Sequence, residues 1–198
     1  MLTAAFLIIT LIISVTLHEY AHAWMADHWG DDTPRLHGRL TLNPFAHLDP
    51  LGFLALIVFK IGWAKPVPVN YRYLRYKGNW ALISTILAGP LANLLLALLA
   101  VILIGLLGLP GASLYAAFLS DFAFYNVFLA LFNLLPLYPL DGGRIAQALL
   151  CDRLAYSVCA TWRQASPFIL IFLLFSGGTH FLATLSLAIL RVMFAFIV

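Results

Sequence analysis

The chain has 198 residues, of which 63% are hydrophobic and only 10% are charged, and its mean hydropathy is +0.97. This composition excludes an ordinary water-soluble globular domain and predicts one polytopic membrane domain that spans residues 1–198. Because backbone hydrogen bonds inside a bilayer must be closed within helices, the predicted class is all-α. The net charge of +3 is small and scattered along the chain, so we expect the lipid bilayer and no nucleic acid as a partner.

The first apolar run extends from about Leu2 to Ala26 and contains the sequence HEYAH near its C-terminal end. Residues four apart share one face of a helix, so His18 and His22 can bind one metal ion while Glu19 stays off the metal. Two imidazoles and one further ligand suit zinc and leave a position open for water, whose proton an adjacent carboxylate can take. Because Glu19 is the only glutamate in the chain, the motif favours a metal site over two histidines that satisfy other polar groups.

A polar loop over 27–49 follows, in which apolar and polar residues alternate over 39–43 as in a short, half-buried strand. Residues 51–63 are apolar but include Lys60 and are too few for an ordinary crossing, which predicts a short or re-entrant helix. The next segment, KPVPVN at 65–70, alternates proline with valine, and proline confines a strand to a sheet edge. We therefore expect a small juxtamembrane β-hairpin or extended segments, which either cap the helices or pair with an extended substrate segment.

A long apolar span is predicted over about 79–107, and the sequence AGPLAN interrupts it at 88–93. Gly89 allows another helix to approach closely, while Pro90 leaves a carbonyl without its helical partner and favours a kink. The simplest role for Asn93 is a hydrogen bond to another helix, and direct contact with substrate or a metal-bound water is the alternative.

The next span is predicted over about 114–135 and carries three polar residues. Asn126 and Asn133 lie seven residues apart and share a helical face, which we expect to face the protein interior. Asp121 lies near the end of the span that adjoins an uncharged loop, where an interfacial position is its simplest role.

The sequence PLYPLDGG follows this span and brings Asp141 to a break in the helix near the membrane surface, because prolines stop a helix and glycines allow a tight turn. We predict that Asp141 is a metal ligand, and a helix N-cap alone is the alternative. His28, ten residues after His18, is a rival third ligand, but that arrangement requires a glycine at residue 25 and Met25 occupies it. Asp141 is therefore preferred.

Residues 144–164 mix polar and apolar positions and are expected at the interface or leading into the next helix. Two apolar arms, 167–175 and 181–198, surround a Gly-Gly pair and form either a hairpin of two spans or one broken helix. The total is about five or six membrane helices, some of them short or re-entrant. Cys151 and Cys159 form no CxxC pair, so we expect small apolar residues on a reducing side rather than a disulfide.

The distribution of basic residues predicts the orientation in the membrane. Outside the apolar segment 51–63, the loop regions 27–79 and 136–164 contain nine lysines and arginines, whereas the loop at 108–113 contains none. These residues are Arg35, Arg39, Lys65, Arg72, Arg75, Lys77, Arg144, Arg153 and Arg163. By the positive-inside rule both basic regions face the cytoplasm, which brings the end of the first span and Asp141 to the same side. We expect an integral protein of a bacterial-type plasma membrane with its active site toward the cytoplasm.

HExxH in one membrane helix, AGPLAN in a second and NLLPLYPLDGG after a third together resemble the site-2 protease family of intramembrane zinc metalloproteases. The resemblance covers roughly residues 18–144 and is to a minimal form without an inserted PDZ or CBS domain. It implies one zinc ion per chain, bound by His18, His22 and Asp141. It also implies that Glu19 is the general base and that Asn133 supplies an amide to the substrate or the oxyanion.

The sequence thus predicts an enzyme that hydrolyses a peptide bond in or next to a transmembrane segment of a membrane-protein substrate. Two alternatives are a membrane metal transporter and a catalytically silent relative that binds membrane segments. A transporter needs ligands along a path through the bilayer, whereas these candidate ligands lie at one depth. A silent relative has no need for the glutamate that this chain retains at residue 19.

Overall fold

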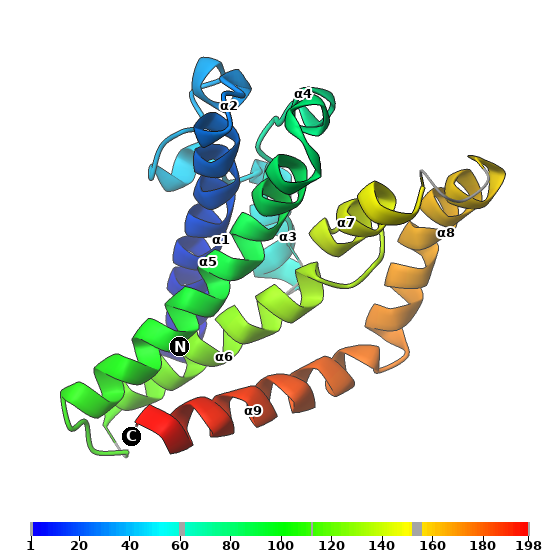
Figure 1. The fold of residues 1–198 in the computed structure, drawn as a ribbon. Coiled ribbons are helices and arrows are strands. Elements are labelled where there is room, and N and C mark those ends of the chain that lie inside the picture. The colour runs from blue at the N-terminus through cyan, green and yellow to red at the C-terminus, as the bar shows by residue number, and fades with distance from the viewer. Residues whose placement is uncertain (1, 60–61, 112, 152–155, 198) are drawn as a thin grey trace. The chain divides into compact units, whose positions relative to one another are not determined.

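The computed structural model describes residues 2–59, 62–111, 113–151 and 156–197, and its regular elements are helices (Figure 1). In these residues no β-strand forms, which confirms the predicted all-α class. The chain divides into two compact units, Met1–Ala92 and Asn93–Val198. Lys60 and Arg153, which figure in the sequence-based predictions, lie outside the described residues.

The first unit begins with the long helix that carries HEYAH. Its elements are α1 (Leu2–His28), α2 (Thr33–Leu36), the 3₁₀ helix η1 (Pro44–Ala46), α3 (Pro50–Phe59), α4 (Tyr71–Lys77) and the first half of α5 (Asn79–Leu106). α3 has 10 residues, which agrees with the short apolar helix predicted there. α5 runs without a break through Pro90, so this proline lies within the helix and does not end it.

The second unit contains the rest of α5 and four further helices, α6 (Leu114–Asn133), α7 (Asp141–Leu150), α8 (Tyr156–Phe175) and α9 (Gly178–Ile197). The two apolar C-terminal arms are therefore separate helices, and the chain turns between them at Gly177, whose φ is +83°. Among the described residues, five helices are long and apolar enough to cross a membrane: Ala5–His28, α5, α6, α8 and α9. This number agrees with the predicted five or six.

The predicted juxtamembrane hairpin does not form in the described residues, where an isolated bridge between Leu48 and Ala64 is the nearest equivalent. Residues 39–43 are irregular because side chains bond the local backbone, as when the Asn43 side chain accepts a hydrogen bond from the Phe45 amide. Residues 65–70 form neither helix nor strand, and their two prolines have no N–H to donate to a ladder. The alternative prediction of extended segments stays a prediction for residues 65–70.

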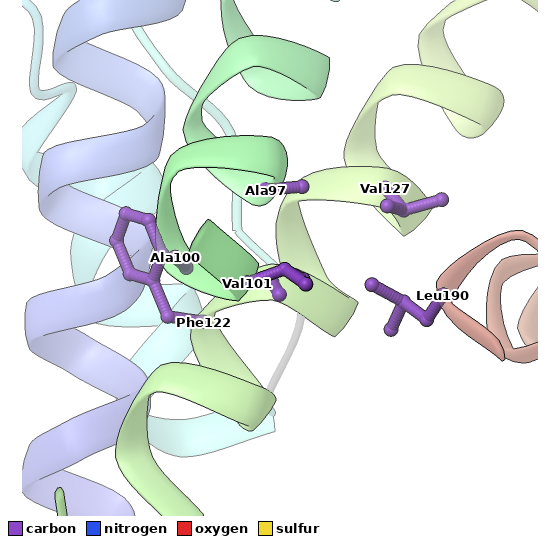
Figure 2. Packing of buried hydrophobic residues seen from close by; sticks show 7 residues of the cluster. Ala97, Ala100, Val101, Phe122, Val127 and Leu190 are labelled. Carbon is purple, nitrogen blue, oxygen red and sulfur yellow. The ribbon is translucent and has the colours of Figure 1, made fainter. Parts of the chain in front are cut away.

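The hydrophobic core of the second unit lies where α5, α6 and α9 meet (Figure 2). It consists of Ala97, Ala100, Val101, Phe122, Ala123, Val127 and Leu190. The alanines allow the backbones to approach closely, which is how helices associate when lipid removes the hydrophobic driving force between them.

A polar contact joins α5 to α6 within this unit. Asn93 Nδ2 donates to Asn126 Oδ1 at 2.9 Å, and Asn126 Nδ2 donates to the Phe122 carbonyl at 2.9 Å. Both asparagines are fully buried. The predicted interhelical hydrogen bond of Asn93 is therefore confirmed.

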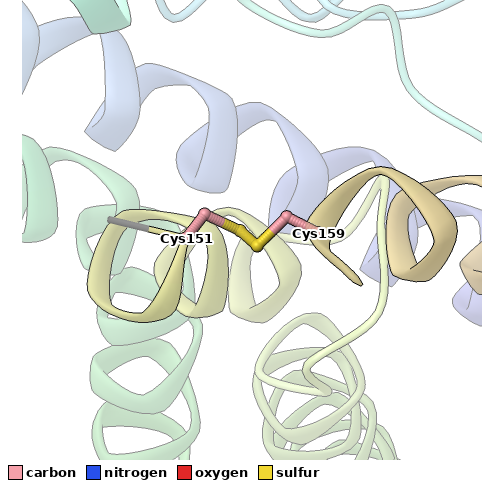
Figure 3. Close-up of a disulfide and its surroundings, with 2 residues drawn as sticks. All are labelled: Cys151 and Cys159. Carbon is pink, nitrogen blue, oxygen red and sulfur yellow. A yellow bond between two sulfur atoms is a disulfide. The ribbon is translucent and has the colours of Figure 1, made fainter. Parts of the chain in front are cut away.

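The prediction that Cys151 and Cys159 stay unpaired is wrong, because their sulfur atoms form a disulfide (Figure 3). Cys151 follows the last residue of α7 and Cys159 lies in the first turn of α8, and the Cα atoms are 5.8 Å apart. The bond depends on the ends of two helices meeting, which the spacing of cysteines in the sequence does not reveal.

Replacing both cysteines, Cys151→Ser and Cys159→Ser, should lower the free energy of unfolding by about 2 to 3 kcal/mol, since the bridge closes a short loop in the unfolded chain. Unfolding of the purified protein in detergent measures this difference, and adding a reductant to the wild type should have the same effect. If both thiols of the wild type react with an alkylating agent without prior reduction, the bridge is absent.

Candidate metal centre

α1 places His18 and His22 side by side in its buried face. Each side chain is 9% exposed, the ring centroids are 4.7 Å apart and the ring planes meet at 84°. The two Nε2 atoms are 3.1 Å apart. The structure thus brings these two nitrogens together, as the spacing of four residues predicts.

The protonation of His22 is fixed by α5. Its Nδ1 lies 2.8 Å from the Thr85 carbonyl oxygen, and because a carbonyl only accepts, Nδ1 carries the proton. The lone pair of the neutral ring is therefore on Nε2, the atom that faces His18. Metal-binding histidines are commonly oriented in this way by a hydrogen bond from the second ring nitrogen.

The spacing of the two nitrogens fits a single zinc ion. Tetrahedral zinc with Zn–N bonds of about 2.0 to 2.1 Å requires its nitrogen ligands to lie about 3.3 Å apart. The observed 3.1 Å is close to that value. Two imidazoles in this arrangement can therefore supply two of the ligands to one ion.

Gly89 of α5 lies directly against the imidazole pair. A Cβ atom at this position would be 2.4 Å from His22 Nε2 and 2.6 Å from His18 Nε2. The sequence predicted only a helix-packing role for Gly89, and nothing in its pattern pointed to Thr85. Both roles come from the contact of α5 with α1, which the pattern of AGPLAN does not specify.

Glu19 follows His18 on α1 but has a different environment. It is half-buried, and its Oε2 accepts a hydrogen bond of 2.9 Å from the backbone N–H of Val67. No other hydrogen bond to Glu19 occurs among the described residues. One carboxylate oxygen is therefore restrained by the backbone while the other is available to accept a proton.

The KPVPVN segment that restrains Glu19 is itself held at both ends. The Lys65 amide donates to the His47 carbonyl at 2.9 Å, and the Asn70 amide donates to Asp31 Oδ2 at 2.7 Å. These bonds hold residues 65–70 beside Glu19 of α1 without a neighbouring strand in the described residues.

Asp141 belongs to the second unit, where it is the first residue of α7 and is 8% exposed. The N-cap position of this helix is Leu140, so Asp141 is not the cap residue. The two glycines that follow Asp141 lie where any side chain would clash with the backbone. A Cβ at Gly142 would be 2.2 Å from the Leu134 carbonyl oxygen, and one at Gly143 would be 2.5 Å from the Leu137 carbonyl carbon. The turn is therefore packed tightly around the start of α7.

Asn133 is the last residue of α6 and is half-buried. Its Nδ2 donates to the Leu129 carbonyl at 2.9 Å. An amide nitrogen has two hydrogens, so this bond leaves one donor and the Oδ1 acceptor for another group.

The rival ligand His28 is engaged elsewhere. α1 continues through Met25 to His28, whose ring stacks on Trp24 with centroids 5.6 Å apart and meets Trp29 edge-on. With no turn at residue 25, the helix carries His28 one and a half turns beyond His22. Its contacts are with aromatic rings at the end of the helix.

Proteins with similar sequences carry names that describe zinc metalloproteases, which agrees with a metal site at the two histidines. Residues 6–121 and 109–177 match the sequence profile described as peptidase family M50. The chain is 46% identical over 151 residues to "Putative zinc metalloprotease YwhC" of Bacillus subtilis, which covers 73% of this chain and 68% of that protein. It is also 36% identical over 137 residues to "Putative zinc metalloprotease Rip2" of Mycolicibacterium smegmatis. That match covers 66% of this chain and 52% of Rip2.

A more distant relative is "Zinc metalloprotease MJ0392" of Methanocaldococcus jannaschii, which is 27% identical over 157 residues. That match covers 77% of this chain but only 36% of the relative. The chain therefore spans about half of the mycobacterial protein and about a third of the archaeal one. No solved structure matches it at a significant level.

Substituting Gly89→Ala should reduce the zinc content of the purified protein to a small fraction of the wild-type value. The new methyl group must displace the imidazoles, whereas alanine favours the helix itself by about 1 kcal/mol over glycine. Elemental analysis of zinc per chain measures the effect. Gly111→Ala is the matched control, because nothing lies within 4 Å of a Cβ at that position. Wild-type zinc content in Gly89→Ala would contradict the proximity of α5 to the metal-binding nitrogens.

Proposed function

Because the chain belongs to peptidase family M50, the site-2 protease family of membrane zinc metalloproteases, we propose that it cleaves membrane-protein substrates in or next to a transmembrane segment. The observation that carries this proposal is the pair of buried imidazoles with Nε2 atoms 3.1 Å apart. Glu19 lies between them in the sequence and does not bind the metal, so its carboxylate can exchange protons with the attacking water and the leaving amine. This arrangement provides both parts that metal-assisted hydrolysis needs.

The proposed metal ligands are His18, His22 and Asp141, which bind one zinc ion per chain. Two facts support this set: all three side chains are buried, and the Nε2 atoms of the two histidines lie 3.1 Å apart. Two imidazoles and one carboxylate, with an open position, are a common ligand set for catalytic zinc.

When bound, zinc polarises a carbonyl oxygen and lowers the pKa of a water molecule toward about 7. Glu19 takes a proton from the attacking water and then delivers it to the nitrogen of the leaving amine. The N–H of Val67 holds one oxygen of Glu19, so the other oxygen carries the proton between the two groups. Asn133 is proposed to bind the substrate backbone or the developing oxyanion through its second N–H.

The substrate must present an extended backbone at this site. A helix hides its carbonyl groups in internal hydrogen bonds, so local unwinding has to precede attack. We propose that the KPVPVN segment offsets part of that cost by pairing with the unwound substrate. The lack of a strand partner for residues 65–70 in the described chain and the exposure of Lys65 and Pro66 support this role.

The active site is proposed to face the cytoplasmic side of a bacterial-type plasma membrane. Arg35 and Arg72 are exposed in the loops that follow α1 and precede α5, at the same end of the spans as HEYAH. Clusters of basic residues in short loops mark the cytoplasmic side. Water reaches a site near that surface more readily than one at the centre of the bilayer.

Cleavage of a tagged single-span substrate by the purified protein tests the proposed function. Glu19→Gln should lower cleavage at least about a hundredfold, because an amide cannot accept the water's proton. Its zinc content should match the wild type, since Glu19 is not a ligand. Asp121→Asn makes the same chemical change at an exposed residue of α6 and should cleave normally. Equal cleavage by the wild type and Glu19→Gln would exclude Glu19 as the base.

A further inference from the structure

Arg39 is a charged residue in an unusual environment. It lies in the loop after α2 and is only 6% exposed. Nη1 donates to the Pro66 carbonyl at 3.1 Å and Nη2 donates to the Lys65 carbonyl. Among the described residues no carboxylate forms an ion pair with it. Burial lowers the pKa of Arg39, and the negative charge of Glu19 opposes this shift.

Burying a guanidinium without a carboxylate partner costs free energy, so packing alone does not explain an arginine here. Its planar donors can hold two neighbouring carbonyl groups at once, which a lysine cannot do with the same geometry. The two carbonyls that Arg39 holds immediately precede Val67, whose N–H binds the carboxylate of Glu19.

One peptide group connects Arg39 to Glu19. The Pro66 carbonyl and the Val67 N–H belong to the same planar peptide unit, and they point in opposite directions across it. Arg39 binds the oxygen of this unit and Glu19 binds its hydrogen. Fixing one side of a rigid plane fixes the other, and hydrogen bonds in such a chain polarise one another.

We propose that Arg39 is a positioning residue for the general base, acting through the Pro66–Val67 peptide to hold the carboxylate of Glu19 beside the metal-binding histidines. This inference rests on the proposed proteolytic function. Pro66 and Pro68 restrict the backbone on both sides of Val67, which leaves rotation of this peptide as the motion that Arg39 prevents. Loss of Arg39 therefore misplaces the base without removing a metal ligand.

Kinetics of substrate cleavage with two variants of Arg39 test the proposal. Arg39→Met, which keeps the length of the side chain but not its donors, should lower kcat about tenfold or more while KM changes by less than about threefold. Arg39→Lys, which can still donate to one carbonyl, should recover part of kcat. Zinc content should match the wild type in both. Arg35→Gln is the control, because Arg35 forms an exposed ion pair with Asp27 at 2.6 Å.

Amide hydrogen exchange gives a second measurement that does not depend on activity. The two prolines leave only four amides between residues 65 and 70, so the exchange of Val67 can be resolved. Arg39→Met should accelerate exchange at Val67, whereas Arg35→Gln should not. Unchanged exchange at Val67 would exclude the connection through the peptide.

The outcomes separate this inference from the proposed function. If the wild type cleaves no substrate, the proposed function fails, while the exchange experiment still decides whether Arg39 holds the peptide. If the wild type cleaves and Arg39→Met retains its kcat, only the positioning role fails. Loss of zinc in Arg39→Lys, or a kcat no higher than that of Arg39→Met, would contradict the positioning role and indicate a purely structural one.

Discussion

The contact between the histidines of α1 and the backbone of α5 is the constraint on which the first unit depends. Two imidazoles buried in an apolar span need polar partners, and a metal site needs their lone pairs to converge. The Thr85 carbonyl orients His22, and Gly89 removes the side chain that would otherwise occupy the space beside both rings. α5 supplies both features about one turn apart and continues through Pro90.

The polar loops between α1 and α5 contribute to the site because the Val67 N–H binds the carboxylate of Glu19. A strand with ordinary residues would pair with a neighbouring strand, but the prolines of KPVPVN prevent a ladder. The side chains of Arg39, Glu19 and Asp31 bind this backbone instead. The segment thus connects Glu19 to the loop that carries Arg39.

The sequence predicted those features that depend on local spacing. Apolar runs located α1, α5 and α6, the four-residue spacing located His18 and His22 on one face, and Asn93 was predicted to form an interhelical hydrogen bond. The same runs left open whether the C-terminal arms form one helix or two. Features that depend on tertiary contacts were missed. The disulfide of Cys151, the carbonyl of Thr85 and the side-chain bonds that replace a hairpin all require elements to meet in space, which neither composition nor periodicity reveals.

We propose that Asp141 supplies the third ligand of a zinc site to which His18 and His22 supply the first two. X-ray absorption at the zinc edge of the purified protein measures this directly. We predict one zinc ion with two imidazole nitrogens at about 2.0 to 2.1 Å and otherwise only oxygen ligands, and one oxygen fewer or no bound zinc in Asp141→Ala. A sulfur ligand at about 2.3 Å, or an unchanged spectrum and zinc content in Asp141→Ala, would contradict the account.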